Sequence, residues 1–383
     1  RGHIDLRSTI TTGGNLESVL GTATLAVVGD RIYSSGLIPS QRGSAVSETR
    51  QVYQAAADVM HRAGSSLNDV VRVRAWFTEQ ETVEAINATH PVLFDDPGPA
   101  LSIVGAPNLP NGVKVMLELE AVIGSAADQQ HFQPQTGQGW SYAVRHNDEI
   151  WVSGLTSANV EGSNGSEDGY ASTVTEVMGT VSDALTGVGV EPSEVVATRH
   201  FMARDVHGWA LPQAKLDFMA QSTPTSAGIT VDRTSDDNAP FMFECEAVSG
   251  AQAVAKRVWS GRTYETEHNY CRAVRVGDVV YIAGTTATLP GEIVQHPYEA
   301  AGQVEDILTI IRRAIEEHEL AWSDLVRTRT YVVGGADKLV EAQEVLHKVL
   351  GGMDTAAAVV GVPVLGRPEV VVEIEATAVV SSS

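Results

Sequence analysis

An alternating acidic phrase occurs three times in this chain and constrains its fold more than any other feature. Its copies are Leu117–Val122, Phe243–Val248 and Val372–Ala376. Each copy begins apolar, acidic, apolar, acidic, small, and such alternation predicts a strand with one buried face and one face that carries two carboxylates. Successive copies are about 125–130 residues apart, and a strand that recurs at a fixed period predicts one domain repeated three times.

Two further sets of residues keep the same period. Glycines end the predicted hairpins at Gly36, Gly154 and Gly284, and arginines occupy the predicted middle strands at Arg74, Arg199 and Arg329. We therefore predict three copies of a ββαβαββ unit, at residues 1–124, 139–250 and 266–381. Polar linkers are expected near residues 124–138 and 250–266, and the second copy is the most diverged.

Apolar residues at helical spacing predict two helices in each copy. The expected helices cover residues 47–63, 81–94, 170–186, 208–220, 298–318 and 337–350, with Ser47 as the N-cap of the first. The fold class is α/β (α+β), with a sheet covered by two helices on one face. Because the other face of each sheet must also be buried, we expect a monomeric pseudo-trimer with an inner β-barrel and outer helices. Further dimerisation is left open.

Composition narrows the choice of partners and compartment. The net charge is −22 and the chain has no run of Lys or Arg, so nucleic-acid binding is not expected. No apolar run is long enough to span a membrane. Two cysteines, Cys245 and Cys271, do not indicate a disulfide framework, and the expected compartment is the cytoplasm.

Several phrases of the chain resemble the reactive intermediate deaminase family, also called Rid or YjgF-like. They are Ile32–Pro39, Ala63–Val71 and Ile86–Thr89 in the first copy, and Tyr270–Asp278 and Val326–Tyr331 in the third, together with the acidic strands. The resemblance implies a chorismate-mutase-like fold, a trimeric arrangement with ligand clefts between neighbouring units, and hydrolysis of reactive enamines or imines to keto acids and ammonia. It also implies that neither a metal nor an organic cofactor takes part.

The chain departs from the family at the arginine that clamps the substrate carboxylate. The matching positions are Leu101, Ser226 and Ala357, so all three copies lack it. The family's cleft tyrosine matches Tyr270, with Ala23 and Trp140 in the other copies. Its second-helix asparagine matches Asn87, with Pro212 and Gln343 elsewhere. These departures predict a substrate other than a simple amino-acid-derived imine.

The family's water-positioning glutamate matches Glu373, Glu244 and Glu118, and Glu373 is the first candidate for a catalytic acid or base. A carboxylate in a partly apolar cleft can have a raised pKa and exchange protons near neutral pH. The competing interpretation is a strand glutamate paired with an arginine. The second acidic positions, Glu120, Glu246 and Glu375, are expected to form ion pairs with Arg74, Arg199 and Arg329.

Other candidates lie beside the predicted cleft. Tyr270 would orient a carbonyl or ring, and Trp140, Asn87, Cys271 and His268 are candidate substrate-binding residues. Each has a plainer alternative: core packing for the tyrosine, tryptophan and cysteine, and a surface position for the histidine. No metal-binding spacing is present.

These observations favour a cofactor-independent acid–base enzyme. It would hydrolyse or tautomerise an enamine- or imine-type group of a small organic molecule, and a tailoring step in secondary metabolism would suit a fused, diverged trimer. Two alternatives remain: a lyase or cyclase acting on a ring or enol-ether substrate, as chorismatases do, and a small-molecule-binding protein without catalysis.

Overall fold

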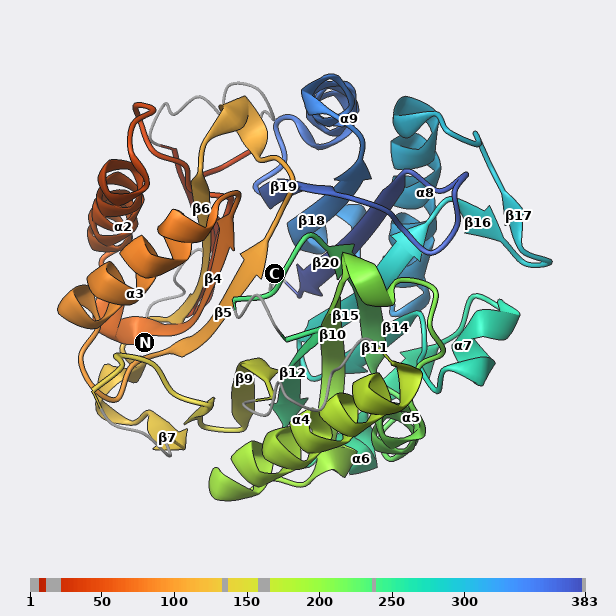
Figure 1. Cartoon of the computed structure of the whole chain (residues 1–383), viewed down its shortest axis with the longest axis horizontal. Coiled ribbons are helices and arrows are strands. Elements are labelled where there is room, and N and C mark those ends of the chain that lie inside the picture. The colour runs from red at the N-terminus through yellow and green to blue at the C-terminus, as the bar shows by residue number, and fades with distance from the viewer. Residues whose placement is uncertain (1–6, 12–21, 133–136, 158–165, 236–238, 381–383) are drawn as a thin grey trace.

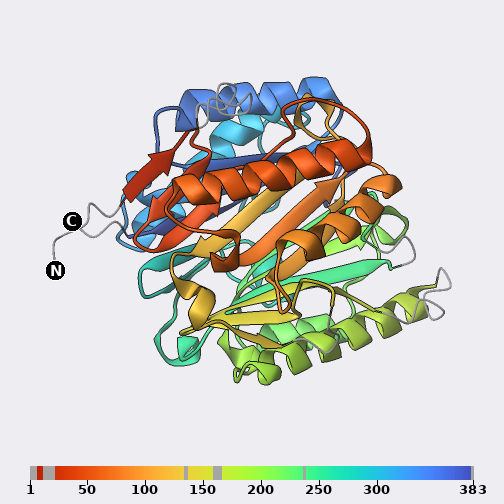
Figure 2. The same cartoon turned by 90° about the vertical axis from the view of Figure 1, so that its left-hand side faces the viewer.

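The computed structural model describes residues 7–11, 22–132, 137–157, 166–235 and 239–380. Within these residues the strands form three six-stranded sheets and one short hairpin of β16 (Thr288–Leu289) and β17 (Ile293–Val294). The strands lie in the interior and the long helices at the periphery (Figures 1 and 2). The predicted mixed α and β architecture, with three related sheets, is confirmed.

Each sheet draws its strands from one third of the chain and repeats the same order. Sheet 1 is β1 (Arg7–Ile10), β2 (Leu25–Val28), β3 (Arg31–Ser34), β6 (Val115–Val122), β4 (Val70–Phe77) and β5 (Ala100–Gly105). Sheet 2 is β7 (Gln130–Phe132), β8 (Ala143–His146), β9 (Glu149–Thr156), β12 (Phe241–Val248), β10 (Val195–Ala203) and β11 (Thr225–Val231). Sheet 3 is β13 (Lys256–Val258), β14 (Ala273–Val276), β15 (Val279–Thr286), β20 (Val372–Val379), β18 (Leu325–Val333) and β19 (Ala356–Val362).

The predicted linkers contain structure that the sequence pattern did not show. β7 and β13 lie within residues 124–138 and 250–266, and each pairs with the first hairpin strand of its sheet. A strand of three residues is too short to show alternation, and for this reason the sequence pattern predicted linkers at these positions. The domain boundaries at 124–139 and 250–266 stay a prediction.

Two main helices accompany each sheet. They are α2 (Ala45–Arg62) and α3 (Gln80–Leu93), α4 (Glu167–Gly187) and α5 (Gln213–Ala220), and α8 (Ala300–Glu317) and α9 (Ala336–Leu350). The cap of α2 was predicted at the wrong residue, because the Ser44 hydroxyl accepts the bond from the Ser47 amide at 3.2 Å. α5 is shorter than expected, since Pro212 caps it and a 3₁₀ turn at Arg204–Val206 precedes it. None of the described helices combines the length and apolar character needed to cross a membrane.

The sheets meet edge to edge around the centre of the molecule. Main-chain hydrogen bonds join neighbouring sheets, among them those from Ala23 to Thr355 (3.2 Å), from Ser141 to Pro99 (3.0 Å) and from Cys271 to Pro224 (3.0 Å). The expected inner barrel does not close among the described residues, because the sheets are joined by isolated bridges and separate main-chain hydrogen bonds rather than by continuous strand ladders.

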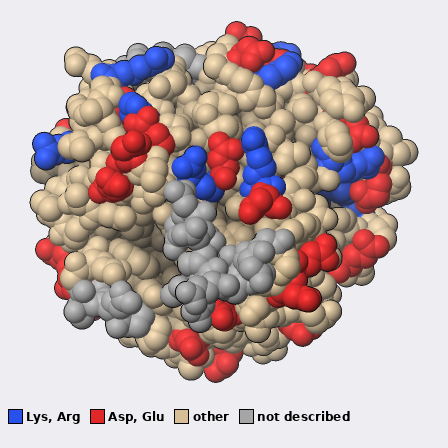
Figure 3. Space-filling view, in the orientation of Figure 1, with Lys and Arg blue, Asp and Glu red and all other residues tan. Residues whose placement is uncertain are grey.

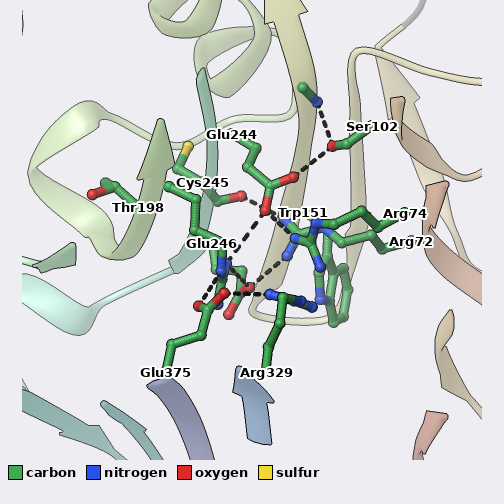
Figure 4. Close-up of polar contacts among 12 residues, drawn as sticks. Arg72, Arg74, Ser102, Trp151, Thr198, Glu244, Cys245, Glu246, Arg329 and Glu375 are labelled. Atoms are coloured by element: carbon green, nitrogen blue, oxygen red, sulfur yellow. Dashed lines mark hydrogen bonds and ion pairs between the residues drawn. The ribbon is translucent and has the colours of Figure 1, made fainter. Parts of the chain in front are cut away.

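Buried ion pairs cross the three junctions in a cyclic order. Arg74 of sheet 1 bonds Glu244 of sheet 2, Arg199 of sheet 2 bonds Glu375 of sheet 3, and Arg329 of sheet 3 bonds Glu118 of sheet 1. Figure 4 shows the guanidinium groups converging on the carboxylates at this centre. A buried charge is stable only when it is paired, so these contacts hold the sheets in one relative arrangement.

Further pairs show which predicted partners were right. Arg199 bonds Glu246 at 2.8 Å, and Arg329 bonds Glu375, as expected. Glu120 instead bonds Arg327 of sheet 3. The prediction for Glu120 was wrong because its strand neighbour in the pairing register is Arg72, with which it also forms a pair at 3.6 Å.

Candidate active site

The strand pairing changes which glutamates correspond to one another. Arg74, Arg199 and Arg329 lie opposite Glu118, Glu244 and Glu375 in their own sheets. Glu375, rather than Glu373, is therefore the counterpart of Glu118 and Glu244. The equivalence expected from the repeated phrase is wrong by two residues.

The hairpin glycines identify the true counterparts of Glu373. A Cβ atom at Gly36 would contact the sulfur of Met116, and one at Gly154 would contact the sulfur of Met242. At Gly284 the same Cβ would lie 2.0 Å from Oε1 of Glu373. Glu373 thus occupies a position that is methionine in the other two copies, and the chain has one carboxylate of this kind rather than three.

Glu373 faces a cavity of about 390 Å³ between sheets 2 and 3. β10 and β11 contribute His200, Ser226 and Gly228, β15 contributes Gly284, and β20 contributes Glu373. α5 and the segment before β14 add Lys215, His268 and Tyr270, and Trp209 and Val370 add apolar surface. The cavity is large enough for a small ring-bearing organic molecule.

Small residues in sheet 2 explain why this junction is open. Ser226 and Gly228 stand where sheet 1 has Leu101 and Ile103, and where sheet 3 has Ala357 and Val359. Replacing the leucine and isoleucine with serine and glycine removes side-chain volume from the wall of the cleft. The short α5 also leaves Gly208 and Trp209 as a loop beside the cavity.

A missing hydroxyl further distinguishes this cleft. The Ser35 hydroxyl accepts a hydrogen bond from the Ala357 amide, and the Ser153 hydroxyl accepts one from the Leu101 amide, each at 2.8 Å. The corresponding position between sheets 2 and 3 is Ala283, which has no hydroxyl to offer the Ser226 amide. Ser226 therefore lines the cavity without the cross-junction bond that its counterparts have.

Burial dominates the electrostatics of Glu373. The side chain is 8% exposed, and no hydrogen bond or ion pair with another described residue stabilises its charged form. Desolvation raises the pKa of the carboxyl to about 8, the negative charge of Glu375 adds to the increase, and Arg272 and Arg262 oppose it. Glu373 is therefore protonated at neutral pH and able to exchange its proton close to that pH.

This raised pKa predicts a pH-dependent stability. Protonation of Glu373 favours the folded state fully below its ordinary pKa of 4.5, and this contribution is lost as the pH rises to about 8. Glu373→Gln stays neutral, so its unfolding free energy should rise relative to the parent by up to about 1.4 kcal/mol per pH unit in that window. Urea unfolding of both proteins at pH 5 and pH 9 measures the change. A difference that is the same at both pH values would contradict the assignment.

Burial lowers the pKa of the amine and the imidazoles that line the cavity. Burial lowers the pKa of Lys215 to about 7. Burial also lowers the pKa of His200 well below its ordinary value, and that of His268 more modestly, with the positive charge of Lys215 contributing to both. The His268 ring lies against Tyr264, with the ring centroids 3.9 Å apart.

Tyr270 lies in the cavity wall on the side of sheet 3. Burial raises the pKa of its phenol, so the hydroxyl keeps its proton and can donate a hydrogen bond. The prediction that Ala23 is the counterpart of Tyr270 in the first copy is wrong by one residue. Ala23 and Cys271 make equivalent main-chain hydrogen bonds, so the residue that matches Tyr270 is Thr22.

A rim of charged residues borders the cavity. Arg262 precedes α7 (Thr263–Glu267) and bonds Glu292 at 2.8 Å, next to the β16–β17 hairpin. Arg367 donates a hydrogen bond to the Glu292 carbonyl at 2.6 Å. Both arginines line the cavity, and sequence reasoning missed them because they lie outside the repeated strands.

The remaining predicted site residues lie elsewhere. Glu118 accepts hydrogen bonds from Arg329 and from the Trp76 indole (2.7 Å), and Glu244 accepts from Arg74 and the Ser102 hydroxyl (2.5 Å). These cationic partners hold the pKa of both carboxyls below their ordinary value against the cost of burial.

Three predicted substrate-binding residues are not among those lining the cavity. Asn87 is exposed on α3, and Trp140 stacks on Tyr142 with the ring centroids 5.4 Å apart. The Cys271 thiol is buried and donates to the Thr223 carbonyl at 3.3 Å, and burial raises its pKa to about 12. The structure thus brings together Glu373, Tyr270 and His268 from the predicted set, and adds Lys215, His200 and Arg262.

The sheet connectivity, the paired outer helices and a ligand-sized cavity between neighbouring sheets define a YjgF-type α+β protein with a chorismate-mutase-like fold. The chain belongs to the family described as Endoribonuclease L-PSP, whose sequence profile matches residues 22–123 and 261–380. Those two segments carry most of sheets 1 and 3. The family resemblance inferred from the sequence is confirmed.

Individual relatives match single segments of the chain. The mitochondrial protein mmf1 of Schizosaccharomyces pombe is 33% identical over 99 residues, which are 24% of this chain and 61% of mmf1. A 2-iminobutanoate/2-iminopropanoate deaminase of Dermatophagoides farinae is 30% identical over 103 residues, covering 25% of this chain and 80% of the relative.

Solved structures match either one third of the chain or most of it. A Mycobacterium tuberculosis member of the YjgF/YER057c/UK114 family is 34% identical, with 33% of this chain and 99% of that chain covered and a TM-score of 0.30. A chorismatase structure covers 81% of this chain and 93% of its own, at 14% identity and a TM-score of 0.52. At this identity the chorismatase supports the fold alone.

Proposed function

We propose that this protein is an enzyme that performs acid–base chemistry on a small organic molecule in the cavity between sheets 2 and 3. The reaction is hydrolysis or tautomerisation of an enamine- or imine-type group. The observation that carries the proposal is Glu373, a buried carboxyl without an ionic partner among the described residues and with a pKa of about 8. Membership of the family and the deaminase relative support small-molecule chemistry of this general class.

The side chains suggest how an imine would be hydrolysed. Protonated Glu373 donates its proton to the imine nitrogen, which makes the adjacent carbon electrophilic. The resulting carboxylate accepts a proton from the water that attacks this carbon, and collapse of the carbinolamine releases ammonia and the carbonyl product. Tyr270 donates a hydrogen bond that orients the substrate, and the apolar wall formed by Trp209 and Val370 excludes bulk water.

The lining of the cavity indicates the kind of substrate. The family's clamping arginine is replaced by Ser226, so a bidentate carboxylate clamp is not available at that position. Arg262 and Arg367 lie at the rim instead, where they could attract an acidic group farther from the reacting bond. We expect a ring-bearing or aromatic substrate, with one working cleft in a monomeric pseudo-trimer.

Nucleic acid does not fit this proposal. The net charge of −22 repels a phosphate backbone. On the face drawn in Figure 3, Lys and Arg side chains lie beside Asp and Glu rather than forming a continuous basic area.

The proposal is tested by measuring ammonia released from imines generated in the assay. The wild-type protein should accelerate ammonia release from aromatic imines above the protein-free rate, and more than from small aliphatic 2-imino acids. Equal rates with and without protein across both groups would contradict it.

A second candidate reaction is a lyase or cyclase step on a ring or enol-ether substrate. The similarity to a chorismatase fold, which covers most of both chains, is the observation that supports this second candidate. It predicts product formation without ammonia, so mass analysis of the same reactions distinguishes the two. A ligand-binding protein without catalysis would give neither product.

A further inference from the structure

Lys215 is a buried amine that the proposed acid–base mechanism does not use. It is the third residue of α5 and 1% exposed, yet it lines the same cavity as Glu373. Among the described residues no carboxylate lies within ion-pair distance of its Nζ atom. A lysine buried without a counter-ion is costly, and its presence at a ligand-sized cavity calls for a functional explanation.

The other lysines have ordinary surroundings. Lys114, Lys338 and Lys348 form ion pairs with Glu79, Glu341 and Glu305, and Lys256 is exposed on the edge strand β13. The other copies have no lysine at the position of Lys215. Glu373 is likewise the only carboxylate at its position among the three copies, since the other two have Met116 and Met242 there.

We propose that Lys215 is a covalent attachment site, whose Nζ forms a Schiff base with the carbonyl or imine carbon of a ring-bearing ligand in this cavity. With a carbonyl compound, the amine adds to the carbon and the carbinolamine loses water. With an imine, the amine displaces ammonia, and water then cleaves the Lys215 imine to give the carbonyl product and the free amine. No oxidant or reductant is needed in either sequence.

The surroundings of Lys215 suit a nucleophilic amine. Nucleophilic attack requires the neutral amine, and burial with a pKa of about 7 makes that form abundant at neutral pH. The positive end of the α5 dipole, at whose first turn Lys215 lies, also disfavours the ammonium form. Glu373 supplies the acid that the leaving hydroxyl or amine needs, so this inference builds on the proposed function and specifies its substrate as a carbonyl or imine compound.

Borohydride trapping tests the attachment directly. The intact protein is incubated with benzaldehyde at pH 7, reduced with sodium borohydride, and mapped by peptide mass spectrometry. We expect one benzyl group on Lys215, with labelling at least about tenfold above every other lysine, because exposed amines with a pKa near 10.4 are almost fully protonated at this pH. Label that is absent, or spread evenly over the lysines, would overturn the proposal.

Two variants make the result specific. Lys215→Met, which keeps a similar volume without the amine, should lose the label and fold with an equal or higher melting temperature. Lys256→Arg should keep it. Continued labelling in Lys215→Met would overturn the proposal. The wild-type peptide map decides the matter even if the variant fails to fold.

The trapping result and the proposed function fail independently. Label at Lys215 without ammonia release from any imine would overturn the hydrolysis proposal and leave the attachment site. Ammonia release that depends on Glu373, with no label at Lys215, would overturn the attachment site and leave the hydrolysis proposal.

Discussion

Glu373→Gln is expected to lower kcat for imine hydrolysis by about 10²–10⁴-fold, the usual contribution of a positioned general acid or base. Glutamine preserves the size of the side chain and its place against Gly284, but it can neither donate nor accept a proton in this step. KM should change little, because Tyr270 and the apolar wall still hold the substrate. Steady-state rates of ammonia release from the best aromatic imine measure both constants.

A matched control tests whether the effect belongs to this cleft. Met242→Leu changes the counterpart of Glu373 at the junction between sheets 1 and 2, and it should leave kcat unchanged. Undiminished ammonia release in Glu373→Gln would rule out the assigned role. A parallel loss in both variants would point to a general effect on the fold rather than to acid–base catalysis.

The repeats and their elements were predictable because they depend on local patterns. Alternation marks β6, β12 and β20 without ambiguity, and the helical spacing of apolar residues located all six long helices to within a few residues, apart from the start of α5. The arginines Arg74, Arg199 and Arg329 lie on middle strands of their sheets, as predicted. Such features need no knowledge of distant partners.

The register of Glu373 could not be found in the same way. A strand has a period of two, so a shift of two residues leaves every side chain on its original face. The phrase around Glu373 and Glu375 therefore matches that around Glu118 and Glu120 at either of two offsets. Only the pairing with β18, where Arg329 lies opposite Glu375, distinguishes them.

The cavity was unpredictable because its walls come from distant segments. Lys215 and Glu373 are separated in the sequence by more than one full repeat, and neither belongs to a motif that predicts the other. The small residues Ser226 and Gly228 open the cleft, but their effect depends on which strand faces them. The sequence indicated Glu373 and Tyr270 through the family resemblance, and His268 through its place beside the predicted cleft. Lys215 could be found only from the three-dimensional arrangement of the sheets.

Arg329→Met is expected to destabilise the protein by about 3–5 kcal/mol, the usual cost of removing one partner from a buried ion pair. Arg329 is completely buried and bonds Glu118 across the junction of sheets 1 and 3 as well as Glu375 within sheet 3. Its removal leaves Glu118 with a hydrogen bond from Trp76 but without a cation in bonding distance among the described residues. The free energy of urea unfolding at pH 7 measures the loss.

The double variant Arg329→Met with Glu118→Leu should recover part of that loss, because it removes the orphaned carboxylate while Glu375 keeps its bond to Arg199. The exposed pair of Lys348 and Glu305 provides the contrast, and Lys348→Met should change the unfolding free energy by less than about 1 kcal/mol. Equal effects of the two single variants would mean that the central ion pairs do not hold the sheets together. A large loss for Arg329→Met alone would mean that the cyclic ion pairs stabilise the three-sheet arrangement. Glu373 takes part in none of these pairs.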